Sequence, residues 1–268
     1  MSTMKMTHVV VVAKRHLGES WHYPRKGQHE AVVAVLQALK KRDIRYQIRD
    51  RKFLRKKLNA DLIITVGGDG TLLAASHHSG QIPLLGVNSM PAASTGFFCK
   101  ATTKTFPQML DKMIAGTLQP RLLYRIRVKI GKKTIPVFAL NDVLFASGIA
   151  GDTTRYILQI GQKKEFQKSS GVWVATASGS TAAIYSAGGK KESLRSKRLQ
   201  YKVREPFRYP KPRYKNLHGF VPPPTKITIL SKTDDSMVFL DGPSCRYSVP
   251  FGTKVTLQGG VTPLPIFL

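Results

Sequence analysis

Acidic residues are scarce in this sequence: its 268 residues include 15 Asp and Glu against 43 Lys and Arg, a formal net charge of +28. Such a positive field attracts polyanions, so nucleic acids, nucleotides, polyphosphate and acidic membrane surfaces all stay open as ligands. A basic proteome in the source organism would produce the same balance. Charge alone therefore assigns no function.

Cysteines and long apolar runs are also scarce. Cys99 and Cys245 lie far apart, which argues against a disulfide framework and favours a reducing cytosol. The apolar run at 9–13 is too short for a signal peptide, and the uncharged stretch 171–189 is too rich in Gly, Ser and Thr to span a membrane. We expect a cytoplasmic protein with no membrane partner.

Metal-ligand and hydrolase patterns are missing. His77 and His78 have no further His, Cys or carboxylate at ligand spacing, so we expect no structural metal. No Ser–His–Asp order surrounds Ser178 or Ser180.

Strand-like and helix-like segments alternate over residues 8–120. The runs "HVVVVA", "IRYQI", "DLIITV" and "IPLLGVN" predict strands, and "GQHEAVVAVLQALKKR", "RKFLRKKL", "TLLAASHHSG" and a segment starting near Thr105 predict helices. This rhythm predicts an α/β domain over 1–120 with a doubly wound, Rossmann-like parallel sheet.

The pattern changes after Pro120. "YRIRVKI" alternates apolar and basic residues, "TIPVFALNDVLF" reads as one returning strand, and short strand-and-turn units follow. We expect an antiparallel, β-rich domain over 121–250, and a C-terminal tail over 251–268 that packs back on the first domain. The segment 190–215 holds 11 basic and 2 acidic residues, and we favour a solvated loop or edge over a polyanion-binding arm because no nucleic-acid-binding motif accompanies it.

The motif "GGDGT", at Gly67, Gly68, Asp69, Gly70 and Thr71, follows the buried run "DLIITV". Glycines at a strand-to-helix turn let the backbone approach a ligand and bind phosphate through its N–H groups. Asp69 could accept a proton from an attacking hydroxyl, or it could be a helix N-cap. Since a cap needs one glycine at most, three glycines favour a ligand.

Two further motifs lie downstream. In "ALNDVLF" the polar residues Asn141 and Asp142 interrupt an apolar run, where ribose hydroxyls would be suitable partners. "VATASGSTAAIYSAGG", at 174–189, is dense in small and hydroxyl side chains, which suits close approach of a ligand and equally suits a capped turn.

In this order and spacing, "GGDGT", "LND" and "TASGSTAAIYSAGG" resemble the NAD kinase family over about residues 9–242. "GGDGT" alone is shared with diacylglycerol and sphingosine kinases, so the second and third motifs discriminate. The loop "GVNSMPAASTGFF" resembles the divergent, mitochondrial-type branch of the family.

The resemblance implies transfer of the ATP γ-phosphoryl group, with Mg²⁺, to the 2′-hydroxyl of the adenosine ribose of NAD(H). Asp69 would be the catalytic base, and a homodimer or homotetramer is implied. The residues implied to bind nucleotide are Gly67, Gly68, Asp69, Gly70, Thr71, Asn141, Asp142, Arg155, Lys168, Thr181, Ala182 and Ser186.

The sequence departs from the family at Ala183, Ser170 and Pro243, where the family usually has an aromatic residue, an aspartate and a glutamine. NAD against NADH, and ATP against polyphosphate, therefore stay open. Two other functions stay open as alternatives: a diacylglycerol- or sphingosine-type lipid kinase, and a non-catalytic basic protein on a kinase fold that binds polyanions, although no specific nucleic acid is expected.

Overall fold

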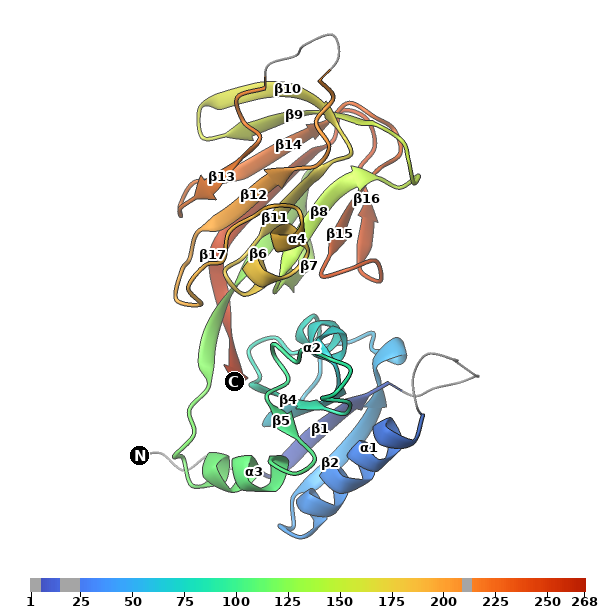
Figure 1. Ribbon diagram of the computed structural model, residues 1–268, viewed down its shortest axis with the longest axis vertical. Coiled ribbons are helices and arrows are strands. Elements are labelled where there is room, and N and C mark those ends of the chain that lie inside the picture. Colours follow the sequence, from blue (N-terminus) through green and yellow to red (C-terminus); the bar gives the residue numbers. More distant parts are fainter. Residues whose placement is uncertain (1–5, 15–24, 209–213) are drawn as a thin grey trace. The chain divides into compact units, whose positions relative to one another are not determined.

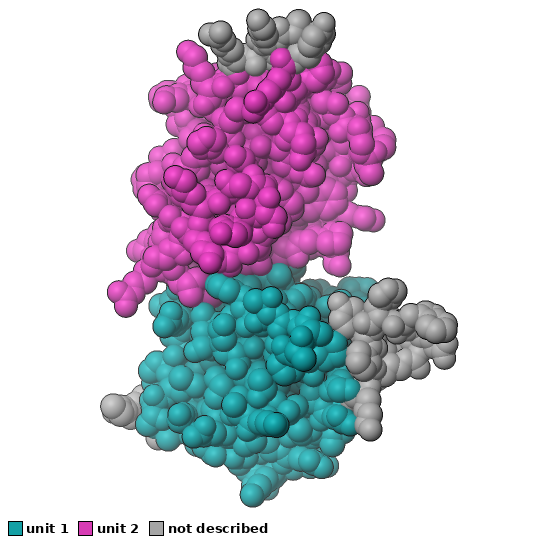
Figure 2. Space-filling view, viewed as in Figure 1, with its two compact units in different colours: residues 1–122, 264–268 teal, residues 123–263 magenta. Residues whose placement is uncertain are grey.

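The computed structural model describes residues 6–14, 25–208 and 214–268. It divides into two compact units, residues 1–122 with 264–268, and residues 123–263 (Figure 2). Residues 1–5 and 15–24 of the expected first domain, and 209–213 of the basic segment, lie outside the described residues.

The first unit is built on a parallel sheet (Figure 1). Strand β1 lies between β2 and β3, and β3 pairs with β4, all in parallel register. The short β5 pairs parallel with β4, as does the end of the last strand, β17. The bounds are β1 His8–Ala13, β2 Arg45–Asp50, β3 Leu62–Gly67, β4 Leu84–Asn88, β5 Ala101–Thr102 and β17 Lys254–Phe267.

Three helices accompany this sheet: α1 Arg25–Lys40, α2 Asp69–Ser76 and α3 Phe106–Ile114. One face of the sheet shares a buried core with α1 and α3, because alternate strand residues such as Val9, Val11 and Ile64 turn to the same side. The expected α/β fold class is confirmed.

The helix expected over "RKFLRKKL" is wrong beyond its first turn. Only a short 3₁₀ turn, Arg51–Phe53, forms there, and Leu54 is already extended. Leu54 is buried, but Leu58, at helical spacing from it, is only half-buried and Phe53 is 65% exposed, so little packing supports a helix here.

The second unit contains two groups of strands that share one core. In the first group β10, β9, β14 and β17 are neighbours, and β6 pairs with β17 and β7. In the second, the order is β13-β12-β11-β8-β15-β16, antiparallel throughout. Buried residues of both groups, among them Ile126, Tyr156, Phe145 and Val174, form that core.

The strands of this unit are β6 Arg121–Ile130, β7 Lys133–Ala139, β8 Asp142–Ser147, β9 Thr154–Ile160, β10 Lys163–Ser169, β11 Val172–Ala175, β12 Leu199–Val203, β13 His218–Val221, β14 Ile227–Ser231, β15 Ser236–Leu240 and β16 Arg246–Ser248. A 3₁₀ turn, Ser178–Thr181, and the short helix α4, Ala183–Ser186, follow β11. The antiparallel, β-rich class expected for this region is confirmed.

The expectation of one strand over "TIPVFALNDVLF" is wrong. The segment forms two strands, β7 and β8, which pair with different partners, and the chain bends at Leu140 and Asn141 between them. Strand β17 begins at Lys254, within the segment expected as a tail, and residues 254–263 of it belong to the second unit. Among the described residues, no helix has the length and apolar character needed to cross a membrane.

Candidate active-site segments

The "GGDGT" motif forms the turn from β3 into α2. The N-cap of α2 is Gly68, and Asp69 is the first helical residue, so Asp69 is not the cap. Gly67 has a φ of 150°, and a Cβ there would lie 2.6 Å from Oγ1 of Thr71. The sharp turn therefore requires glycine. The N–H of Thr71 already donates to the carbonyl of Gly68, whereas those of Asp69 and Gly70 precede the helical hydrogen-bond pattern and can face a ligand.

The carboxylate of Asp69 is held by the backbone of residues 97–99. Oδ2 accepts the N–H of Phe97 at 2.8 Å, and Oδ1 accepts those of Phe98 at 2.8 Å and Cys99 at 3.3 Å. A carboxylate has about four acceptor positions, so one near Oδ2 stays available. The half-buried side chain is thus fixed in orientation and still able to accept another proton donor.

The loop that supplies these N–H groups depends on Gly96. Its φ is 58°, and a Cβ there would lie 2.6 Å from Nδ2 of Asn88 and 3.0 Å from the carbonyl oxygen of Cys99. Asn88, at the end of β4, in turn donates to the carbonyl of Ser94 and accepts from the N–H of Met90. The thiol of Cys99 is buried, and burial together with the charge of Asp69 raises its pKa well above the ordinary value.

A cleft of about 230 Å³ opens at the carboxyl ends of the parallel strands of this unit. Backbone of the "GGDGT" turn lines the cleft, together with cationic side chains that follow β1 and β2. The lining residues include Lys14, Arg51, Gly67, Gly68, Gly70 and Thr71. This edge of a parallel α/β sheet is the usual ligand-binding position. Glycine backbone and cations together suit phosphate groups.

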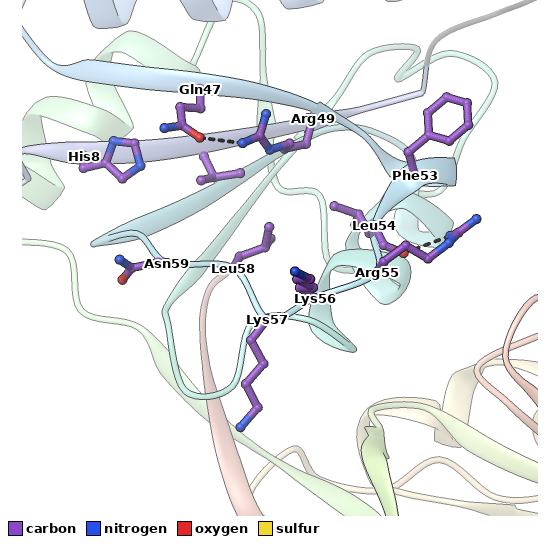
Figure 3. A pocket seen from close by; sticks show the side chains of 11 residues that line it. His8, Gln47, Arg49, Phe53, Leu54, Arg55, Lys56, Lys57, Leu58 and Asn59 are labelled. Atoms are coloured by element: carbon purple, nitrogen blue, oxygen red, sulfur yellow. Dashed lines mark hydrogen bonds between the residues drawn. The ribbon is translucent and has the colours of Figure 1, made fainter.

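A second hollow of the same unit, about 500 Å³, lies over β1, β2 and residues 53–59 (Figure 3). Its cations do not converge on one point. Arg49 bonds to Gln47, Arg55 bonds to carbonyls of its own segment, and Lys57 points away from both β2 side chains (Figure 3). None of the expected site residues lines this hollow.

In the second unit the structure brings the second and third motifs together. Oγ1 of Thr176 donates to the carbonyl of Leu140 at 2.6 Å, and Oγ of Ser178 donates to the same carbonyl at 2.8 Å. The N–H of Thr176 donates to the carbonyl of Asn141 at 2.8 Å. A Cβ on Gly179 would collide with that carbonyl. The small residues of the third motif therefore hold the bend that carries Asn141.

The N–H groups of the same bend donate to the carboxylate of an acidic residue far along the chain. Asp241, which follows β15, accepts the N–H groups of Leu140, Asn141 and Asp142 at 2.8, 2.7 and 3.1 Å. Oδ1 of Asn141 is buried and has no hydrogen-bond partner among the described residues. An unpaired buried polar atom is costly, so this acceptor is suited to a ligand that donates a hydrogen bond.

Asp142 is 5% exposed at the start of β8. Burial, and then the negative charge of Asp241, raise the pKa of Asp142 to about 7. Charged and neutral forms of this carboxyl group are therefore both populated near neutral pH.

The remaining expected residues fall in two places. Thr181 and Ser186 are exposed, and Ala182 is half-buried, at the 3₁₀ turn and α4. Arg155 and Lys168 are cross-strand partners on β9 and β10, on the face opposite to the core residue Tyr156. No described hydrogen bond or ring contact joins this pair to Asn141 or Thr181.

Several residues of these segments escaped the sequence analysis. Lys14, Arg51, Asn88 and the N–H groups of 97–99 contribute to the first unit, and Asp241 to the second. Asn88 and Asp241 each stand at or just after the end of a strand, the position that had singled out Asp69, and this shared placement was the available signal.

Comparison with known proteins gives the family. A model of the ATP-NAD kinase N-terminal domain matches residues 3–118. The chain is 35% identical over 232 residues to a probable NADH kinase of Oryza sativa subsp. japonica, covering 78% of this chain and 71% of that one. It is 33% identical over 253 residues to an NADH kinase of Arabidopsis thaliana, covering 86% and 77%.

Solved structures show the same fold. An NAD kinase from Archaeoglobus fulgidus in complex with ATP superposes with a TM-score of 0.73 at 23% identity, covering 97% of this chain and 93% of that one. Yeast NADH kinase complexed with NADH gives 0.79 at 18% identity, covering 97% and 83%. The family model and the curated relatives define a phosphotransferase. The chain belongs to the NAD kinase family.

Proposed function

We propose that this protein transfers the γ-phosphoryl group of ATP to the 2′-hydroxyl of the adenosine ribose of NAD(H), giving NADP(H). The observation that carries the proposal is the Asp69 carboxylate, fixed by three backbone N–H groups at a glycine turn beside a cleft with cationic side chains. Family membership supports the same reaction.

In this proposal Asp69 is the catalytic base. Oδ2 of Asp69, at its free acceptor position, takes the proton of the 2′-hydroxyl group. At the same time the oxygen of that hydroxyl group forms a bond to the γ-phosphorus of ATP. The bond from that phosphorus to the β–γ bridging oxygen breaks, and ADP leaves with the electron pair. Phosphoryl transfer demands mainly positioning and charge neutralisation, so one base is sufficient.

The donor phosphates are proposed to lie in the cleft against the N–H groups of Gly68, Asp69 and Gly70, with Lys14 and Arg51 as cations. Mg²⁺ neutralises phosphate charge when it is bound. The described residues contain no cluster of three or more His, Cys, Asp or Glu side chains that could hold a metal, so we propose that the ion enters on the donor phosphates.

The dinucleotide is proposed to bind Asn141 and Asp142, whose side-chain oxygens can accept hydrogen bonds from ribose hydroxyls. Thr181, Ala182 and Ser186 would line its pocket, and Arg155 with Lys168 would contact its phosphates. Because the two plant relatives are named NADH kinases, we propose that NADH is an acceptor as well as NAD. A homo-oligomer, dimeric or tetrameric, and a cytoplasmic location complete the proposal; the free thiols of Cys99 and Cys245 are compatible with a reducing compartment.

A turnover assay tests this function. Purified protein is given NAD or NADH with ATP and Mg²⁺, with polyphosphate replacing ATP in one arm and diacylglycerol or sphingosine replacing the dinucleotide in another. NADP(H) formation that EDTA abolishes is expected. Lipid phosphorylation, or no NADP(H) with either donor, would overturn the proposal.

A nucleic-acid arm completes the assay. Salt-sensitive nucleic-acid binding without turnover would support the non-catalytic alternative instead.

A further inference from the structure

The bend at Leu140 and Asn141 is held from two sides. Its carbonyl groups accept hydrogen bonds from Thr176 and Ser178 of the third motif. Its N–H groups, with that of Asp142, all donate to the single carboxylate of Asp241. The N–H of Asp241 also donates to the carbonyl of Asp142 at 3.0 Å, so the two segments are joined in both directions.

The conformation of Asp241 is specialised for this task. Its φ is 51°, in the left-handed region that few non-glycine residues occupy, and it lies between the end of β15 and Gly242. Strain of this kind persists only where the surroundings impose it. The three N–H groups gathered by its carboxylate identify those surroundings.

Two charged groups act on this cluster. Arg125 of β6 is 1% exposed, and burial lowers its pKa to about 10 while the charge of Asp241 opposes that change. Asp241 in turn acts on Asp142. Among the described residues, the charged group that acts on Asp142 from the neighbouring elements is Asp241, whose charge also acts on Arg125. Thr176 and Ser178, which bond to the bend, are neutral.

We propose that Asp241 is the positioning residue of the Asn141 and Asp142 segment, and that its negative charge adds to the burial of Asp142 in setting the pH below which dinucleotide binding weakens. This inference rests on the proposed function, because Asn141 and Asp142 are taken there as the residues that bind NAD(H). Asp241 itself contacts backbone and is not a catalytic residue.

The direction of the pH response follows from the ligand. Ribose hydroxyl groups donate hydrogen bonds, so the ionised carboxylate of Asp142 is the better acceptor. Protonation of Asp142 as the pH falls through about 7 should therefore weaken binding. Removing the negative charge of Asp241 favours ionisation of Asp142 and moves this loss of affinity to lower pH.

The test is equilibrium binding of NADH to the full chain, followed by its fluorescence from pH 5.5 to 9, with turnover measured in parallel. Asp241→Asn should raise Kd at least about fivefold at its best pH, because one N–H of the bend loses its acceptor. The midpoint of the pH response should also move to lower pH. KM for ATP should change less than about twofold, because the hydrogen bonds that Asp241 accepts come from residues 140–142 and none of those residues lines the phosphate cleft.

Asp234→Asn is the matched control, since it removes an exposed carboxylate of the loop before β15 and leaves the bend untouched. Asp142→Asn should abolish the pH response in the same assay, and adding Asp241→Asn to it should restore none. A melting curve shows whether each variant is folded.

The possible results separate the two proposals. Wild-type protein that fails to bind NAD(H) at any pH contradicts the proposed function. Wild-type binding with a flat profile from pH 5.5 to 9, or a folded Asp241→Asn variant with the midpoint of the wild type, overturns the role of Asp241 and leaves the kinase proposal standing. If Asp241→Asn does not fold, the Asp142→Asn profile decides: a response that survives that change contradicts the proposal.

Discussion

Asp69 in the first unit and Asp241 in the second each accept three backbone N–H groups. Around Asp69 the loop 97–99 orients the carboxylate, which in the proposed function would meet the reacting hydroxyl group. Around Asp241 the carboxylate orients the loop, which carries the side chains that would meet the ligand. The same hydrogen-bond pattern thus orients a side chain in one unit and a backbone segment in the other. The groups around each carboxylate determine which of the two it does.

The neighbours differ in charge and in burial. Asp69 stands half-buried beside a cleft with glycine backbone and cations, whereas Asp241 has a second carboxyl group and a buried arginine next to it. A short motif search finds the first carboxylate because its glycines are local. The strand-end position of the second can be read from the sequence, but its role becomes clear only when residues a hundred positions apart are brought together.

The largest expected effect tests Asp69 directly. Asp69→Asn keeps the size of the side chain but removes the base, so kcat for NADP(H) formation should fall roughly 10²- to 10⁴-fold. The affinity for NADH should change little, in contrast to Asp241→Asn. Steady-state kinetics and NADH binding measure the two quantities. Turnover equal to that of the wild type would remove Asp69 from the mechanism.

The next effect tests the loop that orients Asp69. Gly96→Ala places a Cβ against Asn88 and the carbonyl of Cys99 at a positive φ, so the loop must move. We expect kcat to fall about tenfold or more with NADH affinity nearly unchanged. Gly27→Ala, whose Cβ would make ordinary contacts at 3.6 Å and 3.8 Å, is the control and should retain its kcat.

The corresponding change in the second unit should affect KM for NAD(H), whereas the change at Gly96 affects kcat. Gly179→Ala forces a methyl group against the carbonyl of Asn141, which displaces the bend. KM for NAD(H) should rise about five- to tenfold, while the KM for ATP stays within about twofold. Equal changes in both KM values would mean that the two segments do not act separately.

The smallest expected effect concerns the neutral side of the bend. Thr176→Val removes the hydroxyl that bonds to the carbonyls of Leu140 and Asn141 and should lower the free energy of unfolding by about 1–3 kcal/mol. KM for NAD(H) should rise only about two- to threefold, because Ser178 still donates to the carbonyl of Leu140. Chemical denaturation gives the first quantity. A rise in KM for NAD(H) as large as that of Gly179→Ala would show that the hydroxyl group of Thr176 matters more than the shape of the bend.

The sequence was sufficient for the fold class and for the turn that carries Asp69. Buried β-branched runs separated by amphipathic helices predict a parallel sheet from local periodicity. "GGDGT" predicts a turn whose backbone can approach a ligand closely. The change of pattern after Pro120 likewise indicated antiparallel strands.

Other features depend on contacts that no local pattern encodes. "RKFLRKKL" favoured a helix by composition. Instead the chain is extended at Leu54, which is buried, while Phe53 is exposed. The bend at Leu140 and Asn141 has no glycine or proline of its own, since the nearest proline, Pro136, lies within β7. It forms because Asp241, Thr176 and Ser178 satisfy its backbone groups from distant positions.

Cys99 shows what this arrangement means for reactivity towards oxidants. Its N–H binds Asp69, while its thiol is buried and kept in the protonated form by that burial and that charge. Peroxides and disulfides react with thiolates, so this sulfur is protected although it belongs to the loop that holds the Asp69 carboxylate. Oxidants should therefore leave the loop that orients Asp69 intact.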